Sequence, residues 1–293
     1  MAVGTLIMCP RFTSKPTAAD LHLAVAQRNT AGVESIVASG VNINSSIRGT
    51  TPLGLAIYRR YDDVVEILVQ AGADVNQRSQ DHLERIEPPL CSACRLGNLA
   101  VVKILLQTPS IDVNKRDFFN KTPLWTAVKE KRPDLVKLLL ANKADVNAGE
   151  IWSECPLHLA TKYRGRREIA DMLIRSGCRV NVADSDDRTP LFWTIQHSDR
   201  RIFTLLIYGG AKIKNPDWLS QSSLPLSWKN DRTFCEWVEK LRVTPPRLSW
   251  LSRNCIRRWL ALRWKQLDNS TIDLLPLPKR LKDFVRLLDV KET

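Results

Sequence analysis

The stretch Thr122-Pro123-Leu124-Trp125-Thr126-Ala127 is one of five copies of a box that contains a Pro-Leu pair. The prolines of the five boxes, at positions 52, 89, 123, 156 and 190, lie 37, 34, 33 and 34 residues apart. A weaker copy without proline, Asp20-Leu21-His22-Leu23-Ala24, precedes them. A period between about 20 and 50 residues is typical of stacked repeats. The sequence therefore predicts a solenoid of six similar units.

A second marker follows each box and indicates where each repeat ends. Its fullest form is Gly72-Ala73-Asp74-Val75-Asn76, and related endings occur at 40–44, 111–114, 143–147, 177–181 and 210–214. The last of these ends in Lys214 rather than asparagine. Because the two markers recur in phase several times, we expect one structural unit per period.

The chemistry of helix ends explains both markers. Proline suits the first helical position, because its missing N–H would be unpaired there in any case. A threonine before the proline can cap the exposed N–H groups in three boxes: Thr51, Thr122 and Thr189. A second helix is predicted after each box, for example over 134–140, where apolar residues have helical spacing. Three glycines suit the left-handed position that ends this helix: Gly72, Gly177 and Gly210.

The boxes and the Gly-Ala-Asp-Val-Asn endings resemble those of the ankyrin repeat, and the resemblance covers residues 17–214. It implies an all-α solenoid of about six helix-turn-helix repeats. One such repeat cannot bury its own apolar face, whereas a stack can, and the surface of the stack binds partners. The stretch 77–87 is longer than a standard turn between repeats.

The repeat pattern stops after Lys214. Residues 215–245 contain Trp218, Trp228 and Trp237, and we expect this Trp-rich connecting segment to pack on the last repeat. Two prolines, at 245 and 246, then open a predicted helix. Its apolar residues lie at helical spacing: Leu248, Leu251, Cys255, Ile256, Trp259 and Leu262. A Leu-Pro-Leu-Pro element over 275–278 and a short amphipathic stretch over 279–288 follow.

This order of elements resembles a SOCS box, which we place at residues 246–290, after an N-terminal tail at 1–16, the repeats at 17–214 and the connecting segment at 215–245. A SOCS box after ankyrin repeats is the plan of the ankyrin repeat and SOCS box family. The resemblance implies that elongin C, paired with elongin B, binds Leu248, Leu251, Ser252, Cys255 and Ile256. It also implies that cullin 5, with its RING protein, binds Leu275, Pro276, Leu277 and Pro278.

The family plan implies a substrate-recognition adaptor of a cullin–RING E3 ubiquitin ligase, which promotes ubiquitination and degradation of a bound protein. Such a subunit is not an enzyme, and we expect no cofactor and no metal site. The alternative is a ligase-independent ankyrin scaffold that sequesters a protein partner. Ser252, where the family usually has cysteine, and Arg247 are the residues that favour this alternative.

Two sets of residues are candidates for the substrate surface. Alignment of the boxes places Phe118, Phe119, Ile151 and Trp152 at the tips of two adjacent turns, where polar residues are usual. Exposed apolar clusters mark interfaces, although these side chains can also pack on each other. The second set follows the boxes and is mostly basic: Arg59, Arg60, Lys129 and Lys162. It predicts an acidic partner and salt-sensitive binding.

Composition limits the remaining possibilities. The 293 residues include 44 Lys+Arg and 31 Asp+Glu, a net charge of +13. A basic chain suits acidic proteins, nucleic acid or anionic membranes as partners, but the helical stripe accounts for the aromatic residues at 247–264 without nucleic acid.

Seven cysteines at irregular spacing, without a secretory signal, indicate reduced thiols and a cytoplasmic or nuclear location. Cys91 and Cys94 are expected to be buried thiols, and His158 a structural hydrogen-bonding residue. No apolar stretch is long enough to span a membrane.

Overall fold

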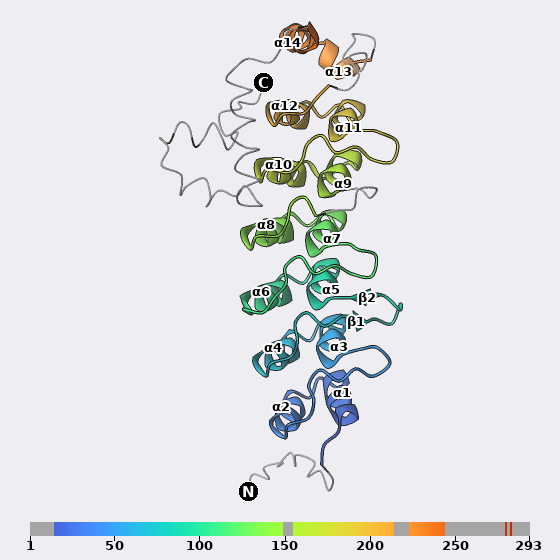
Figure 1. Ribbon diagram of the computed structural model, residues 1–293, viewed down its shortest axis with the longest axis vertical. Helices are drawn as coiled ribbons and strands as arrows, with labels where there is room; N and C mark the ends of the chain where they lie inside the picture. The colour runs from blue at the N-terminus through green and yellow to red at the C-terminus, as the bar shows by residue number, and fades with distance from the viewer. Residues whose placement is uncertain (1–14, 149–154, 214–222, 244–278, 280–281, 283–293) are drawn as a thin grey trace, which may run out of the picture. The chain divides into compact units, whose positions relative to one another are not determined.

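A computed structural model describes residues 15–148, 155–213, 223–243, 279 and 282 of the chain. The chain divides into two compact units, Met1–Pro123 and Leu124–Thr293, called here the N-terminal and C-terminal units. Apart from one short hairpin, the regular secondary structure of the described part is helical, which confirms the predicted fold class (Figure 1). Each unit is described by itself below.

The N-terminal unit contains three helix pairs. The pairs are α1 (Ala18–Ala26) with α2 (Thr30–Ala38), α3 (Pro52–Arg59) with α4 (Asp62–Gln70), and α5 (Pro89–Leu96) with α6 (Leu99–Gln107). The odd-numbered helices pack on one another in one row, and the even-numbered helices pack in a second row beside them (Figure 1). Each repeat therefore buries its apolar face against the next, as the physics of stacked repeats requires.

The C-terminal unit repeats this arrangement. Its pairs are α7 (Pro123–Lys129) with α8 (Pro133–Ala141), α9 (Pro156–Lys162) with α10 (Arg167–Arg175), and α11 (Pro190–Gln196) with α12 (Arg200–Tyr208). Two further helices, α13 (Leu226–Lys229) and α14 (Arg232–Val243), come after the last pair. The six predicted repeats are thus confirmed.

The core consists of the residues that the boxes repeat. The box leucines are at most 2% exposed: Leu21, Leu53, Leu90, Leu124, Leu157 and Leu191. Burying one such side chain contributes about 1.5–3 kcal/mol. The small box residue three positions later, for example Ala56 or Ala93, is fully buried and lets neighbouring helices approach closely.

Box proline begins the first helix of five repeats, but threonine caps it less uniformly than expected. Thr51 is the N-cap of α3, and its hydroxyl accepts a hydrogen bond from the Gly54 N–H at 3.0 Å. The expected cap by the Thr189 hydroxyl is wrong: the Phe192 N–H instead donates to the Thr189 backbone carbonyl at 3.0 Å. The Thr189 backbone carbonyl therefore accepts the N–H that its hydroxyl was expected to accept.

The asparagines of the repeat endings join consecutive repeats. The side-chain carbonyl of Asn44 accepts a hydrogen bond from the Asp74 N–H at 2.8 Å, and Asn76 accepts one from Asp112 at 2.8 Å. In the C-terminal unit, the Asn181 side chain accepts from the Lys212 N–H at 2.6 Å. Each asparagine side chain thus pairs with a backbone N–H of the next repeat that the turn would otherwise leave without an acceptor. Because every such contact needs one asparagine per repeat, this marker recurs with the period of the repeats.

The left-handed positions at the ends of the second helices are confirmed. Gly72, Gly177 and Gly210 have φ values of 88°, 82° and 96°. The equivalent residue of the fourth repeat is not a glycine: Lys143 adopts a φ of 61°. A side chain in this region is strained, so the fourth repeat carries a strain that the others avoid.

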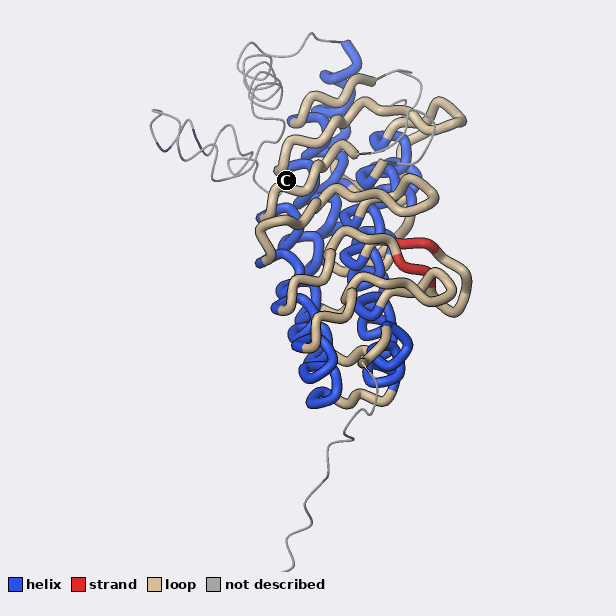
Figure 2. Tube along the Cα trace, turned by 60° about the horizontal axis from the view of Figure 1, so that its bottom comes forward, coloured by secondary structure: helices blue, strands red, loops and turns tan. Residues whose placement is uncertain are grey.

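The long stretch after the second repeat forms a small hairpin, which is the one sheet among the described residues. Strand β1 (Ser79–Gln80) pairs antiparallel with β2 (Ile86–Glu87), and Ser79 lies opposite Glu87. The hairpin protrudes beside the row of odd-numbered helices (Figure 2). The extra residues of this turn therefore form an ordered hairpin, called here the finger, which consists of β1, β2 and the turn between them.

The last helix pair is covered by aromatic side chains from α13 and α14. Trp228 is 2% exposed and lies 5.1 Å from the Phe203 ring, centroid to centroid. Its indole N–H donates to the Ser198 carbonyl at 3.1 Å. Phe234 and Trp237 complete the cluster around Phe203. These residues take the place of a following repeat and keep α12 from exposing its apolar face.

Candidate functional site

Three consecutive turns of the N-terminal unit lie side by side and are tied together by hydrogen bonds. The Gln80 N–H donates to the Gly49 carbonyl at 2.9 Å, and the Thr50 hydroxyl donates to the Gln80 carbonyl at 2.7 Å. On the other side of the hairpin, the Phe118 N–H donates to the Ile86 carbonyl at 3.1 Å. The turns at 45–50, 81–86 and 117–121 therefore form one continuous edge.

Large apolar side chains project from this edge into solvent. Phe118 and Phe119 are each 67% exposed, and Leu83 is 55% exposed. The two phenylalanine rings meet edge to face, with centroids 5.5 Å apart, so they partly cover each other and still leave most of their surface in water. We call this set the hairpin-tip row. It consists of Ile47, Leu83, Ile86, Phe118 and Phe119.

Positive charge surrounds the hairpin-tip row. The three turns and their flanks, residues 45–50, 77–87 and 115–121, contain six Lys or Arg and four Asp or Glu. Two of the four acidic groups, Asp81 and Glu87, are buried and face inward. Neither the Arg48 nor the Arg85 guanidinium makes a hydrogen bond or ion pair with another described residue. The solvent-facing side of the edge is therefore basic.

A buried ionic network holds the hairpin in place. Arg95, at the end of α5, is 3.1 Å from Asp81 and 3.0 Å from Glu87, measured between nitrogen and carboxylate oxygen. The Ser92 hydroxyl also donates to Glu87 at 3.0 Å. The second Asp81 oxygen accepts the backbone N–H groups of Leu83 and Arg85, at 2.8 and 3.0 Å. The finger is thus anchored at its base and at its tip.

Tyr58 closes the network on the side of α3. Its hydroxyl donates to the Ser79 carbonyl at 3.1 Å. Burial, with a smaller contribution from the nearby carboxylates of Glu87 and Asp81, raises the pKa of Tyr58 to about 12. The phenol therefore remains a neutral donor to the first strand of the hairpin at physiological pH.

The basic residues predicted to follow the boxes have different environments. Arg59 is exposed at the end of α3, whereas Arg60 donates to the Leu96 carbonyl at 2.6 Å. In the C-terminal unit, the ammonium of Lys129 lies 5.4 Å from the Trp125 ring centroid. Lys162 is half-buried, 5.3 Å from the Trp193 centroid. The four residues lie in two units, and three of them already have internal partners.

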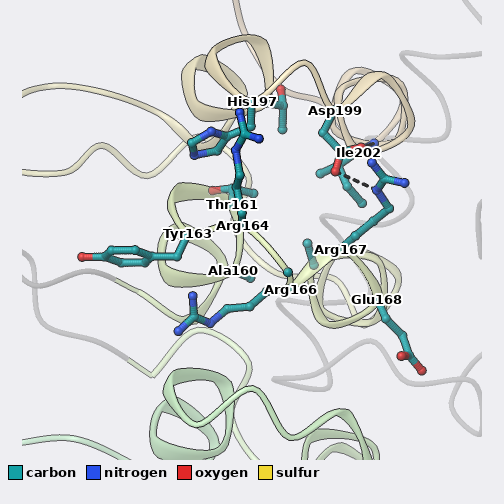
Figure 3. Close-up of a pocket in the computed structure, with 13 residues that line it drawn as sticks. Ala160, Thr161, Tyr163, Arg164, Arg166, Arg167, Glu168, His197, Asp199 and Ile202 are labelled. Carbon is teal, nitrogen blue, oxygen red and sulfur yellow. Dashed lines mark hydrogen bonds and ion pairs between the residues drawn. The ribbon is translucent and has the colours of Figure 1, made fainter.

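A cavity of about 420 Å³ lies between the fifth and sixth repeats (Figure 3). Two of its polar contacts join the fifth and sixth repeats: Arg167 pairs with Asp199 at 2.9 Å, and His197 donates to the Lys162 carbonyl at 2.6 Å. Arg166 turns away from it and donates to the Val128 and Lys129 carbonyls at 2.9 Å. These contacts join successive repeats of the C-terminal unit.

The cysteines and histidines singled out in the sequence are structural. Cys91 and Cys94 are buried free thiols, as predicted, and burial holds the pKa of Cys91 well above its usual range. His158 is 1% exposed, and its Nε2 donates to the Arg188 carbonyl at 3.1 Å. Its Nδ1 is then free to accept from the Cys155 thiol, 3.1 Å away. The described part of the chain contains no cluster of metal-binding side chains.

Several predicted site residues lie outside the described residues. They are the turn residues Ile151 and Trp152, the elongin-binding candidates Leu248, Leu251, Ser252, Cys255 and Ile256, and the cullin-binding candidates Leu275, Pro276, Leu277 and Pro278. Where the structure is described, no helix has the length and apolar character needed to cross a bilayer.

The structure adds residues that sequence reasoning missed. Leu83 and Ile86 were absent from the predicted substrate surface, because the long turn at 77–87 was recognised only as irregular. Two exposed aliphatic residues in an otherwise polar insertion are the signal that would have identified them.

Models of known families match most of the chain. A model of three ankyrin repeats matches residues 12–79 and 79–150, a single ankyrin repeat matches 154–185, and a SOCS box matches 244–286. Ankyrin repeats and SOCS boxes are interaction modules rather than catalytic domains.

Individual relatives agree with these matches. The chain is 34% identical over 197 residues to the ankyrin repeat protein YahD of Escherichia coli K12, which covers 54% of this chain and 96% of YahD. It is 27% identical over 195 residues to mouse inversin, of which it spans only 17%.

Among solved structures, an ankyrin repeat domain from Acinetobacter baumannii AYE has a TM-score of 0.60 at 25% identity, over 66% of this chain and 98% of that one. The ankyrin repeat domain of Bcl-3, a member of the IkappaB protein family, has a TM-score of 0.57 at 26% identity, over 66% and 86% of the two chains. With ankyrin repeats followed by a SOCS box, the chain belongs to the ankyrin repeat and SOCS box family.

Proposed function

We propose that this protein is the substrate-recognition subunit of an elongin B/C–cullin 5 RING ubiquitin ligase. The SOCS-box match at residues 244–286, directly after a set of ankyrin repeats, is the observation that carries the proposal. The protein itself makes or breaks no bond. It raises the effective concentration of a bound substrate near the ubiquitin-conjugating enzyme that the other subunits recruit.

The SOCS box divides the proposed assembly into two contacts. The apolar stripe of Leu248, Leu251, Cys255 and Ile256 suits a helix that lies in a hydrophobic groove of elongin C. In a helix of this register, Ser252 would be next to the stripe in sequence, and a helical serine bonds back to the carbonyl four residues earlier, here that of Leu248. The Leu-Pro-Leu-Pro element over 275–278 is the proposed cullin 5 contact, and its prolines lower the entropy cost of docking.

The ankyrin repeats are the proposed substrate-binding part. The hairpin-tip row is the first candidate contact, because it is both apolar and exposed. Arg59, Arg60, Lys129 and Lys162 are secondary candidates for an acidic substrate. We propose a cytoplasmic and nuclear location, which suits seven cysteines without an evident disulfide framework.

The test is co-expression of the full chain with elongin B and elongin C, followed by pull-down and addition of cullin 5. We expect wild type to form the complete assembly. Leu248→Asp/Leu251→Asp is expected to lose elongin and cullin together. Replacement of residues 275–278 by alanine is expected to lose cullin alone.

The matched control is Phe118→Ser/Phe119→Ser, which changes an exposed surface of the repeats and is expected to retain both partners. Failure of wild type to bind elongin would favour the alternative function, a ligase-independent scaffold that sequesters its partner. Ser252, in place of the usual cysteine, is the observation that supports this alternative.

A further inference from the structure

We infer that the hairpin-tip row binds an extended acidic protein segment that carries bulky apolar side chains. The inference rests on the proposed function only in that this segment would belong to the ligase substrate. Its own basis is the combination of exposed apolar area, a rigid support and a one-sided charge on three adjacent turns.

Exposed apolar area is the first observation. Five of the eight large hydrophobic side chains that are exposed among the described residues lie on these three turns. Phe118 and Phe119 leave two-thirds of their surface in water, although the edge of one ring meets the face of the other. Clustering of such residues on one edge indicates a surface that a partner covers.

Rigidity is the second observation. Arg95, Asp81, Glu87 and Tyr58 hold the hairpin from its base to its tip, and backbone hydrogen bonds link it to the turns on both sides. A long insertion would otherwise be mobile and would lose conformational entropy on binding. A surface that is ordered in advance binds with a smaller entropy cost.

Charge is the third observation, and it selects the partner. Because Arg95 holds Asp81 and Glu87 inside, the acidic residues left on the edge are Glu84, which is exposed, and Asp117, which is half-buried. Arg48, Arg78, Arg85, Lys115, Arg116 and Lys121 remain around the apolar row. Their field favours an acidic segment and disfavours a basic one.

The same charge argues against two internal occupants. A second copy of the chain carries a net charge of +13 and would bring like charges together. Residues 242–293 of the chain itself contain 12 Lys+Arg and five Asp+Glu, so this segment is repelled as well. An acidic partner from outside the chain is the remaining occupant of suitable charge.

The shape of the edge favours a protein segment over nucleic acid. Three of the five side chains of the row, Ile47, Leu83 and Ile86, are aliphatic and offer no flat face on which a base can stack, so only Phe118 and Phe119 could serve nucleic acid in that way. The turns succeed one another along the repeats, so a segment that binds all three must be extended, with side chains directed at successive tips.

The experiment is selection of displayed random peptides of about twelve residues, a length of about 40 Å when extended, on the immobilised full chain. Peptides that bind the immobilisation support without the protein are removed. The enriched peptides are synthesised, and their affinities are measured by fluorescence polarisation. We expect them to combine Asp or Glu with aromatic or branched aliphatic residues.

The affinities of the variants decide the inference. We expect Phe118→Ser/Phe119→Ser to weaken binding about tenfold or more, as loss of a buried aromatic anchor does. Arg48→Gln/Arg85→Gln should weaken it about threefold to tenfold, and added salt should reduce that difference. Leu23→Ser is the matched control, because Leu23 is 56% exposed on α1 and lies outside the row; it should retain affinity within about twofold.

Three results would overturn the inference. The first is an enriched set without acidic residues, and the second is equal affinity for wild type and Phe118→Ser/Phe119→Ser. The third is binding to phosphatidylserine vesicles, lost in that variant, when no peptide is enriched, since this would assign the row to a membrane surface.

The outcome is separable from that of the proposed ligase. Leu248→Asp/Leu251→Asp is expected to lose elongin and to retain the peptides, while Phe118→Ser/Phe119→Ser does the reverse. Peptide binding in a chain that fails to bind elongin would leave the inference intact and overturn the ligase role.

Discussion

Arg95 Nε lies 3.0 Å from Glu87 Oε2, and this pair ties the end of α5 to the second strand of the hairpin. The Arg95 side chain is 19% exposed and that of Glu87 10%, while the Asp81 side chain that Arg95 also contacts is 1% exposed. One cation therefore pairs with two buried carboxylates. The stability of the finger and the sign of charge on its outer surface both depend on this arrangement.

Arg95→Met should destabilise the N-terminal unit by about 3–5 kcal/mol, because it leaves Asp81 and Glu87 buried without their shared cation. Urea denaturation measures the loss, and amide hydrogen exchange should show that residues 79–87 lose protection. Arg28→Met is the control: its pair with Asp63 at 3.1 Å is largely exposed and is worth less than about 1 kcal/mol. Equal effects of the two substitutions would contradict the assigned role of Arg95.

Tyr58 should make stability depend on pH at the alkaline end. Its pKa is about 12 in the folded chain because the phenol is buried, compared with about 10 in an unfolded chain. The folded state therefore holds the proton more tightly, and the stabilisation is complete below the unfolded pKa and is lost as pH rises from about 10 to 12.

The ultraviolet absorbance of tyrosinate measures this titration in the folded protein. Tyr58→Phe should remove a phenol with a pKa of about 12 and should flatten the fall of stability over the same pH range. Tyr208→Phe, which changes a tyrosine of the C-terminal unit, should leave the fall of stability that is assigned to Tyr58 unchanged. A titration that Tyr58→Phe does not alter would show that the phenol is accessible to water.

Lys143→Gly should stabilise the protein by about 0.5–1 kcal/mol, because glycine adopts the left-handed conformation at this position without strain. The reverse experiment is Gly72→Ala. An added Cβ there meets no atom within 4 Å, so the expected loss of about 1–2 kcal/mol reflects backbone strain alone. Thermal denaturation of both variants measures these two changes in stability. A lower stability of Lys143→Gly than of wild type would contradict backbone strain at Lys143.

Trp228→Ala should destabilise the C-terminal unit by about 3–5 kcal/mol, since it removes a buried ring from Phe203 and a hydrogen bond to Ser198. Hydrogen exchange in α12 should increase. Leu226→Ala, two residues earlier, changes a side chain that is 80% exposed and should alter stability by less than about 0.5 kcal/mol. Unchanged exchange in α12 would mean that α13 does not protect the last pair.

Local chemistry explains why some features could be predicted and others could not. The proline at position 52 and the glycine at position 72 act on their own backbone, so their roles could be recognised without a structure. The Thr189 cap failed because a backbone carbonyl competes for the same N–H, and sequence does not reveal which acceptor wins. Lys129 and Lys162 follow the same pattern as Arg59, but the aromatic rings beside them come partly from a neighbouring repeat.

The sequence by itself determined the repeat unit, the number of repeats (six), the buried leucines and the SOCS box, because each of these depends on a short local pattern of residues. Only the tertiary structure decided which charges reach solvent. Asp81 and Glu87 are acidic in sequence and yet do not contribute to the outer surface, since Arg95 from the following helix holds them inside. Such a pairing depends on how a hairpin and a helix meet in space, which no local pattern encodes, and it is what leaves Leu83, Phe118 and Phe119 framed by positive charge.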